Sequence, residues 1–145
     1  DRAYARASVW PRPFIYYSTD GAARFTFSLS NKGTGPAIIR QAEVTLGDTH
    51  YADWQSLQHA LSVEDASYQL SHFSSSVLSA GETLRIFETT STEWVKALAA
   101  QKVNSQLSIT LCYCSIYDEC WLTNRENKPT AVEACALPDN TRFTE

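Results

Sequence analysis

Four cysteines are the residues of this chain whose type and spacing could do chemistry. Three of them, Cys112, Cys114 and Cys120, lie within the stretch CYCSIYDECW, and the fourth is Cys135. Four thiolates could hold a zinc ion, a close pair of thiols could catalyse redox exchange, and two disulfides could cross-link the chain. The spacing of the four residues decides between a metal site, a redox site and a structural staple.

The spacing disfavours both the metal site and the redox site. Zinc ribbons and fingers use cysteine pairs with two to four residues between them, whereas one residue separates Cys112 from Cys114. On a strand these two side chains point to the same face, about 7 Å apart. A thioredoxin-like redox motif needs two intervening residues at the start of a helix. We therefore expect structural disulfides, with no metal and no other cofactor.

The number of residues in the hairpin loop selects the disulfide pairing. With a five-residue loop, 115–119, Cys114 and Cys120 face each other directly, whereas a loop of two or four residues would place Cys120 opposite Ser115. We favour Cys114 with Cys120 and Cys112 with Cys135, because the second bond would tie the last segment to the strand. Four cysteines allow three connectivities, and the other two stay open. Disulfides would indicate an oxidising compartment, the alternative being reduced cysteines in the cytosol.

The remaining motifs indicate turns rather than catalysis. Gly33 and Gly35 begin a phosphate-loop pattern in GTGPA, but Ile38 stands at the third glycine position and the segment joins two expected strands. Neither a GxSxG nucleophile elbow nor an HExxH metal motif occurs. The histidines stand singly along the chain: His50, His59 and His72. We predict that the domain is not an enzyme.

Apolar periodicity predicts several strands separated by turns. In RFTFSLSN, Phe25, Phe27 and Leu29 alternate with polar residues, which is typical of a half-buried strand. Further strands are expected near 14–18, 38–46, 84–88 and 107–112, with one or two closing strands after 120. Turns are expected at 20–21, 31–37 and 80–81. Alternation breaks between Ile39 and Ala42, which predicts a β-bulge near residues 40–41.

Two short helices and one surface loop complete the expected elements. Asp53 is placed to cap a helix that carries Trp54 and Leu57 on one face. Thr90 and Glu93 stand at capping-box spacing before a second helix of about ten residues. The serine-rich segment 62–79 is expected to be an exposed loop with one short strand.

These elements predict a mainly β fold in one domain over residues 1–145. Strands separated by turns argue against a parallel βαβ sheet and favour a two-layer antiparallel, immunoglobulin-like sandwich of about seven strands with two short helical insertions. A hydrophobic content of 43% with 19% charged residues is that of a globular protein. The net charge is -4 and the 12 basic residues form no stripe, which disfavours nucleic-acid binding.

An aromatic segment near the N-terminus is the candidate interaction surface. Pro11 and Pro13 in WPRPFIYY favour an edge strand, since proline in sheets is confined to edges and strand starts. An exposed edge strand can recruit a further strand from a partner. The residues proposed for this surface are Trp10, Phe14, Tyr16 and Tyr17. Most other aromatic side chains are expected to pack in the core.

Three landmarks together resemble a set of uncharacterised bacterial proteins that have one N-terminal transmembrane helix and a single extracytoplasmic domain. The landmarks are ASVWPRP (7–13), NKGTGPAIIRQAEV (31–44) and CYCSIYDECW (112–121). The resemblance spans most of the chain and implies no catalytic residue. It implies a domain on the periplasmic side of the bacterial inner membrane, anchored in the full-length protein by a segment that precedes Asp1.

The expected function is that of a non-enzymatic, membrane-tethered, extracytoplasmic interaction domain with a protein partner. Contact with the membrane would be made only through the missing N-terminal anchor. The alternative is a module that binds a small ligand, a glycan or a metal through the 62–79 loop and neighbouring aromatic residues, or through the thiols. The oligomeric state is not indicated by the sequence.

Overall fold

Alternating apolar side chains form two antiparallel sheets, as the periodicity predicts. The computed structural model describes residues 2–20, 23–64 and 67–145; Gly21, in the expected 20–21 turn, and part of the 62–79 segment lie outside these ranges. Strands make up 40% of the chain and helices 21%, so the mainly β class is confirmed. All the strand pairs found in the described ranges are antiparallel.

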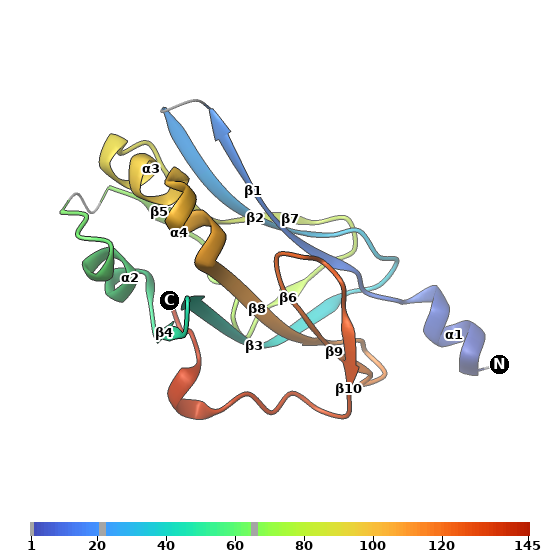
Figure 1. The fold of residues 1–145 in the computed structure, drawn as a ribbon. Coiled ribbons are helices and arrows are strands. Elements are labelled where there is room, and N and C mark those ends of the chain that lie inside the picture. Colours follow the sequence, from blue (N-terminus) through green and yellow to red (C-terminus); the bar gives the residue numbers. More distant parts are fainter. Residues whose placement is uncertain (1, 21–22, 65–66) are drawn as a thin grey trace.

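The two sheets have four and six strands (Figure 1). The first has the order β1-β2-β7-β5, with β1 (Pro13–Asp20), β2 (Arg24–Asn31), β7 (Thr83–Thr89) and β5 (Gln69–Leu70). The second has the order β10-β9-β8-β3-β4, with β10 (Thr130–Val132), β9 (Cys120–Thr123), β8 (Leu107–Cys114), β3 (Ala37–Leu46) and β4 (Thr49–Tyr51); β6 (Val77–Leu78) also pairs with β3. Apolar residues from both sheets form one buried cluster, which is consistent with a β-sandwich.

Four helices accompany the sheets: α1 (Arg2–Ser8), α2 (Trp54–Ala60), α3 (Thr92–Ala99) and α4 (Gln101–Gln106), with a short 3-10 turn at Asp139–Thr141. Across 2–20, 23–64 and 67–145, none of the helices has the length and apolar character needed to span a bilayer. The expected two helices and about seven strands are therefore too few, since the described chain has four helices and ten strands. The additional strands have only two or three residues, too few for alternation to be recognised.

Strand β2 is more deeply buried than its alternation predicts. Phe25, Phe27 and Leu29 are buried as expected, but the intervening Thr26 and Ser28 are buried as well. β2 is a central strand between β1 and β7, and the Thr26 hydroxyl donates to the Glu88 carboxylate of β7 at 3.2 Å. The expectation of a half-buried strand is therefore wrong for β2.

The β-bulge predicted in β3 is confirmed. The register between β3 and β8 shifts between Ile39 and Gln41, at the break in alternation. The extra residue, Arg40, is exposed, while Ile39 and Ala42 both remain in the core. Arg40 instead lies 3.5 Å from the carboxylate of Asp118 in the β8–β9 loop.

The start of α2 is as predicted, whereas the cap of α3 is not. The carboxylate of Asp53 accepts a hydrogen bond from the Ser56 N–H at 2.7 Å. In α3 the cap is Ser91, whose hydroxyl accepts from the Trp94 N–H. The capping box of Thr90 and Glu93 is wrong, because the Glu93 carboxylate accepts from the backbone of another segment, at residue 64.

The described part of the 62–79 segment is not simply an exposed loop. It contains two short strands, β5 and β6, and Phe73 is fully buried. The C-terminal tail covers this segment, with Phe143 buried 5.8 Å from Phe73 between ring centroids. The Glu145 carboxylate accepts from the N–H groups of Phe73 and Ser74. Figure 1 shows the C-terminus beside β4, where Thr144 donates to the Ala52 carbonyl.

Candidate functional site

The cysteine cluster consists of two disulfides at one end of β8. Cys114 joins Cys120, as the five-residue loop favours, and Cys112 joins Cys135, as expected for a bond that ties the last segment to the strand. Residues 115–119 form that loop, and Cys114 lies directly opposite Cys120 in the β8–β9 register. The first bond cross-links the hairpin, and the second ties the tail to β8.

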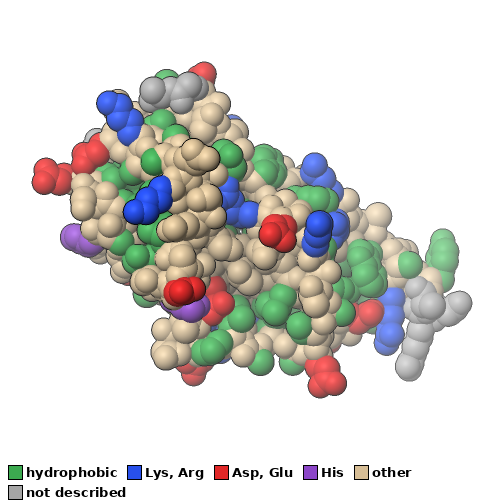
Figure 2. All heavy atoms as spheres, viewed as in Figure 1, with side chains coloured by type: hydrophobic (Ala, Val, Ile, Leu, Met, Phe, Trp, Pro, Cys, Tyr) green, Lys and Arg blue, Asp and Glu red, His purple; other side chains and the backbone are tan. Residues whose placement is uncertain are grey.

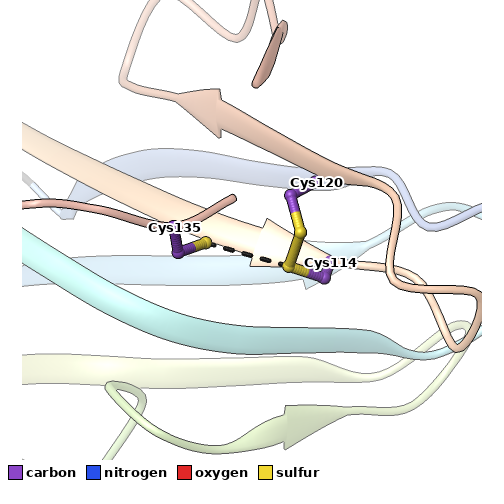
Figure 3. A group of neighbouring side chains, drawn as sticks. All are labelled: Cys114, Cys120 and Cys135. Carbon is purple, nitrogen blue, oxygen red and sulfur yellow. Dashed lines mark hydrogen bonds between the residues drawn. A yellow bond between two sulfur atoms is a disulfide. The ribbon is translucent and has the colours of Figure 1, made fainter. Parts of the chain in front are cut away.

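The two disulfides touch each other. The Sγ atoms of Cys114 and Cys135, which belong to different bonds, are 3.8 Å apart (dashed in Figure 3). Neither sulfur carries a proton in a disulfide, so this is a van der Waals contact rather than a hydrogen bond. The sulfurs of Cys114, Cys120 and Cys135 all lie within 4.8 Å of one another. This spacing would suit a soft metal ion, but metal binding requires thiolates, which intact disulfides do not supply.

A second candidate site lies along β1, which the turn 31–37 holds in place. Asn31 is fully buried, and its side-chain oxygen accepts from the N–H groups of Arg12 and Gly33, both at 3.0 Å. Its amide donates to the carbonyls of Gly35 and Leu78. The residues of GTGPA therefore form the expected turn and not a phosphate loop between a strand and a helix; this turn packs against the segment before β1.

The outer edge of β1 is only partly covered. The Asn127 side chain acts like a neighbouring strand for one residue, since its oxygen accepts from the Ile15 N–H and its nitrogen donates to the Ile15 carbonyl, both at 2.9 Å. In an antiparallel ladder the backbone groups of alternate residues point the same way. The N–H and C=O groups of Tyr17 and Thr19 therefore also point away from β2, and no backbone partner is found for them among the described residues.

A groove follows this free edge. A cavity of about 500 Å³ lies between 15–17 of β1, 104–108 of α4 and β8, and the turn 124–127. A second hollow of about 390 Å³ continues past Thr19 and Phe25 along α4. Both are lined by Tyr17, Asn104 and Ser105, so the two hollows adjoin each other, and together we call them the groove.

Arg125 brings a positive charge into the groove. One guanidinium nitrogen, Nη1, donates to the carbonyls of Leu107 at 2.8 Å and Asn104 at 3.2 Å, and the guanidinium lies 4.8 Å from the centroid of the Tyr17 ring. Burial lowers the pKa of Arg125 from its ordinary value. No ion pair joins it to a carboxylate in the described ranges, although Glu126 also lines the cavity.

Local turn chemistry places Arg125 and Asn127. The Asn124 side chain accepts from the Glu126 N–H, and the Asn127 N–H donates to the Asn124 carbonyl, both at 2.9 Å. Asn127 has a φ of 59°, a left-handed conformation that asparagine adopts more readily than most residues. The sequence shows a polar turn here, but no spacing signal connects it to β1.

The four aromatic residues expected to form one interaction surface do not all lie together. Tyr16 and Tyr17 line the groove and are 41% and 43% exposed. Trp10 is 41% exposed but packs edge-on against Trp121, with ring centroids 4.6 Å apart. Phe14 is half-buried beneath Arg12 and Lys32. Of the four expected residues, the two tyrosines line the groove.

Charged groups elsewhere in the described part of the chain do not gather into a third site. His50 lies 3.6 Å from the Glu43 carboxylate, and His72 lies 3.6 Å from the Glu145 carboxylate, so the two histidines face different partners. Figure 2 shows basic and acidic side chains scattered among one another over the face drawn. Comparisons with protein-family models, with curated proteins and with solved structures each found no match. The geometry of the groove and of the cysteine cluster is therefore the basis for a functional proposal.

Proposed function

We propose that this chain is a non-enzymatic interaction domain that binds an extended, acidic segment of a partner protein by strand addition along β1. The observation that supports this most directly is the free edge of β1 inside a groove. Tyr17 and Thr19 offer two N–H donors and two C=O acceptors in the spacing that an added strand requires.

The groove suits a peptide backbone better than a flat sheet edge would. Its far wall carries Asn104 and Ser105, whose side chains can hydrogen-bond a peptide that has added to β1. Asn127 already satisfies Ile15, so the added strand begins beyond that residue and pairs at Tyr17 and Thr19. This limits the strand addition to a short segment of a few residues.

Arg125 determines which charge we expect on the bound segment of the partner. Its guanidinium is held by two backbone carbonyls and lacks an acidic partner among the described residues, so a carboxylate of the bound segment would supply one. A charge-assisted hydrogen bond to a guanidinium is stronger than a neutral one. The bound segment is therefore expected to carry Asp or Glu at the position that passes Arg125.

The fold is proposed to be immunoglobulin-like. An immunoglobulin sandwich has strands A-B-E-D in one sheet and G-F-C in the other, with C′ added beside C in variable-type domains. The orders β1-β2-β7-β5 and β9-β8-β3-β4 match this arrangement strand by strand, with β6 and β10 as additions. The match supports a sandwich whose first strand is the edge that binds the partner.

The proposed location is extracytoplasmic. Two disulfides are compatible with an oxidising compartment such as the periplasm. Membrane anchoring through a segment that precedes residue 1 is proposed from the resemblance of the three landmarks alone. A tethered domain that captures a segment of an envelope protein would combine these properties.

The experiment is selection of a random nonapeptide display library on the purified, oxidised domain. Thr19→Pro removes one outward N–H from β1, whereas Thr19→Ala keeps the backbone and serves as the matched control. Selected peptides should bind the parent and Thr19→Ala but not Thr19→Pro, and should share an acidic residue at one position. Replacing that residue by Gln should weaken binding about tenfold or more. Equal binding by Thr19→Pro, or no enrichment, contradicts strand addition.

A small-ligand or glycan module is the second candidate, favoured by the amide side chains of Asn104 and Asn124 beside the Tyr17 ring. Such a ligand would be bound by side chains of the groove rather than by the free backbone groups of β1. A glycan array probed with the parent and Thr19→Pro separates the two functions. A sugar bound equally by both proteins would support the second candidate and count against the first.

A further inference from the structure

We propose that the contact between Cys114 and Cys135 supports an intramolecular thiol–disulfide exchange, so that reduction of either disulfide by a dithiol leads to one product, a Cys114–Cys135 bond. This inference rests on the cysteine cluster and does not depend on the proposed peptide groove.

The geometry places the reacting atoms in contact. The Sγ atoms of Cys114 and Cys135 are 3.8 Å apart, and they belong to different disulfides. A disulfide bond is about 2.05 Å long, so the two sulfurs must approach by only about 1.8 Å to bond. Figure 3 shows the Cys135 sulfur directed at the Cys114 side of the Cys114–Cys120 bond. A thiolate formed on either sulfur would therefore lie next to an intact disulfide.

The first route begins with reduction of the hairpin bond. One thiolate of the dithiol attacks Cys120, the Cys114–Cys120 bond breaks, and its electron pair leaves on Cys114 as a thiolate. The second thiol of the reductant resolves the mixed disulfide, which releases Cys120 as a thiol and oxidises the reductant to a disulfide. The Cys114 thiolate then attacks Cys135, the Cys112–Cys135 bond breaks, and Cys112 leaves as a thiolate that takes up a proton.

The second route begins at the tail, where Cys135 is the more exposed member of its pair. Reduction of Cys112–Cys135 by the dithiol leaves thiols on both residues. The Cys135 thiolate attacks Cys114, the Cys114–Cys120 bond breaks, and Cys120 leaves as a thiolate. Each route transfers two electrons from the dithiol, and each ends with a Cys114–Cys135 bond and with thiols on Cys112 and Cys120.

In the product the tail remains cross-linked to β8, whereas the β8–β9 hairpin loses its cross-link. In the oxidised chain Cys112–Cys135 ties the tail to β8, and Cys114–Cys120 cross-links β8 to β9. After exchange the tail is bound two residues further along β8, about 7 Å away, and the hairpin has no cross-link. Phe143 of the tail is buried in the core. Because the Cys114–Cys135 bond keeps the tail attached to β8, the packing of the tail is preserved during partial reduction.

A variant that needs no reductant tests the exchange directly. Cys120→Ser leaves a thiol on Cys114 beside an intact Cys112–Cys135 bond. Alkylation of the native variant, followed by peptide mapping, should place most of the label on Cys112, because exchange holds Cys114 in the bond to Cys135. Label on Cys114 alone would overturn the proposal. The matched control, Cys114→Ser with Cys120→Ser, retains Cys112–Cys135 and should take no label.

Two further measurements keep the test decisive if Cys120→Ser folds poorly. The double variant Cys112→Ser with Cys120→Ser should form Cys114–Cys135 in an oxidising buffer, and two free thiols would contradict the proposed geometry. The parent protein, treated with less than one equivalent of dithiothreitol and quenched with acid, should show its first thiols on Cys112 and Cys120. Thiols on Cys114 with Cys120, or on Cys112 with Cys135, would refute the exchange.

Discussion

Replacement of Asn31 by alanine is the most informative perturbation of the structure that holds β1. The side chain is 0% exposed and makes four hydrogen bonds to backbone groups of Arg12, Gly33, Gly35 and Leu78. These partners come from three segments of the chain that meet where β2 ends. Asn31→Ala would leave two partly buried N–H groups and two buried carbonyls without their side-chain partner.

The expected loss follows from the number of groups left unpaired. A buried polar group without a partner costs about 1–3 kcal/mol, so if water satisfies two of the four groups, the loss is about 2–6 kcal/mol. This is a large share of the roughly 5–15 kcal/mol that stabilises a domain of ordinary stability. The variant should also loosen the segment 9–12 that leads into β1.

Urea unfolding of the oxidised protein, followed by tryptophan fluorescence, measures this loss. The control is Asn140→Ala, an exposed asparagine in the tail for which no side-chain hydrogen bond is found among the described residues, and its change should stay within about 0.5 kcal/mol. A loss below about 1 kcal/mol for Asn31→Ala, with an unchanged denaturant slope, would show that the four hydrogen bonds do not stabilise the native state as inferred.

Three other predictions concern packing and ionisation. Gly35→Ala would place a Cβ 2.1 Å from the Val9 carbonyl oxygen, a backbone atom that no rotamer change can move. The substitution should lower the free energy of unfolding by about 3 kcal/mol, and an unchanged free energy would contradict the close approach. Asp53→Ala should cost about 1 kcal/mol at neutral pH. Hydrogen bonds from Ser56 lower the pKa of Asp53. The stability that the Asp53 carboxylate contributes is therefore present above its ordinary pKa and should fade as pH falls below about 4. A difference in urea unfolding between the parent and Asp53→Ala that does not change with pH would refute this prediction. Burial raises the pKa of Tyr113 to about 12, so the stability that its neutral form contributes is present below about pH 10 and is lost as pH rises through the higher value. Phenolate absorbance of the parent minus Tyr113→Phe should titrate near that pKa, and a difference that titrates near pH 10 would contradict the assignment.

Much of the fold is predictable because it depends on neighbours along the chain. The bulge in β3 follows from the broken alternation between Ile39 and Ala42, and the start of α2 follows from the capping side chain of Asp53. The hairpin parity that aligns Cys114 with Cys120 depends on a local count of loop residues. The cap of α3 is predicted less well, because two adjacent hydroxyl residues compete and the structure selects Ser91.

Features that depend on distant segments are not predictable in this way. The burial of Phe73 depends on the tail, which brings Phe143 over a serine-rich segment of exposed character. The candidate interaction surface divides because Trp10 precedes β1 and packs on Trp121 of β9, whereas Tyr16 and Tyr17 lie on β1 beside the groove. Only Tyr16 and Tyr17 of the four expected residues line the groove.

The sequence by itself determines the mainly β class, the positions of the longer strands and the five-residue loop that favours the Cys114–Cys120 bond, since period-two alternation and turn residues act locally. Tertiary structure alone decides that Asn127 covers Ile15 across 112 residues of sequence, that Arg125 stacks on Tyr17, and that the sulfur of Cys135 touches that of Cys114. These contacts arise from the packing of the two sheets and the path of the tail, which are set by the whole buried core rather than by any one stretch of residues.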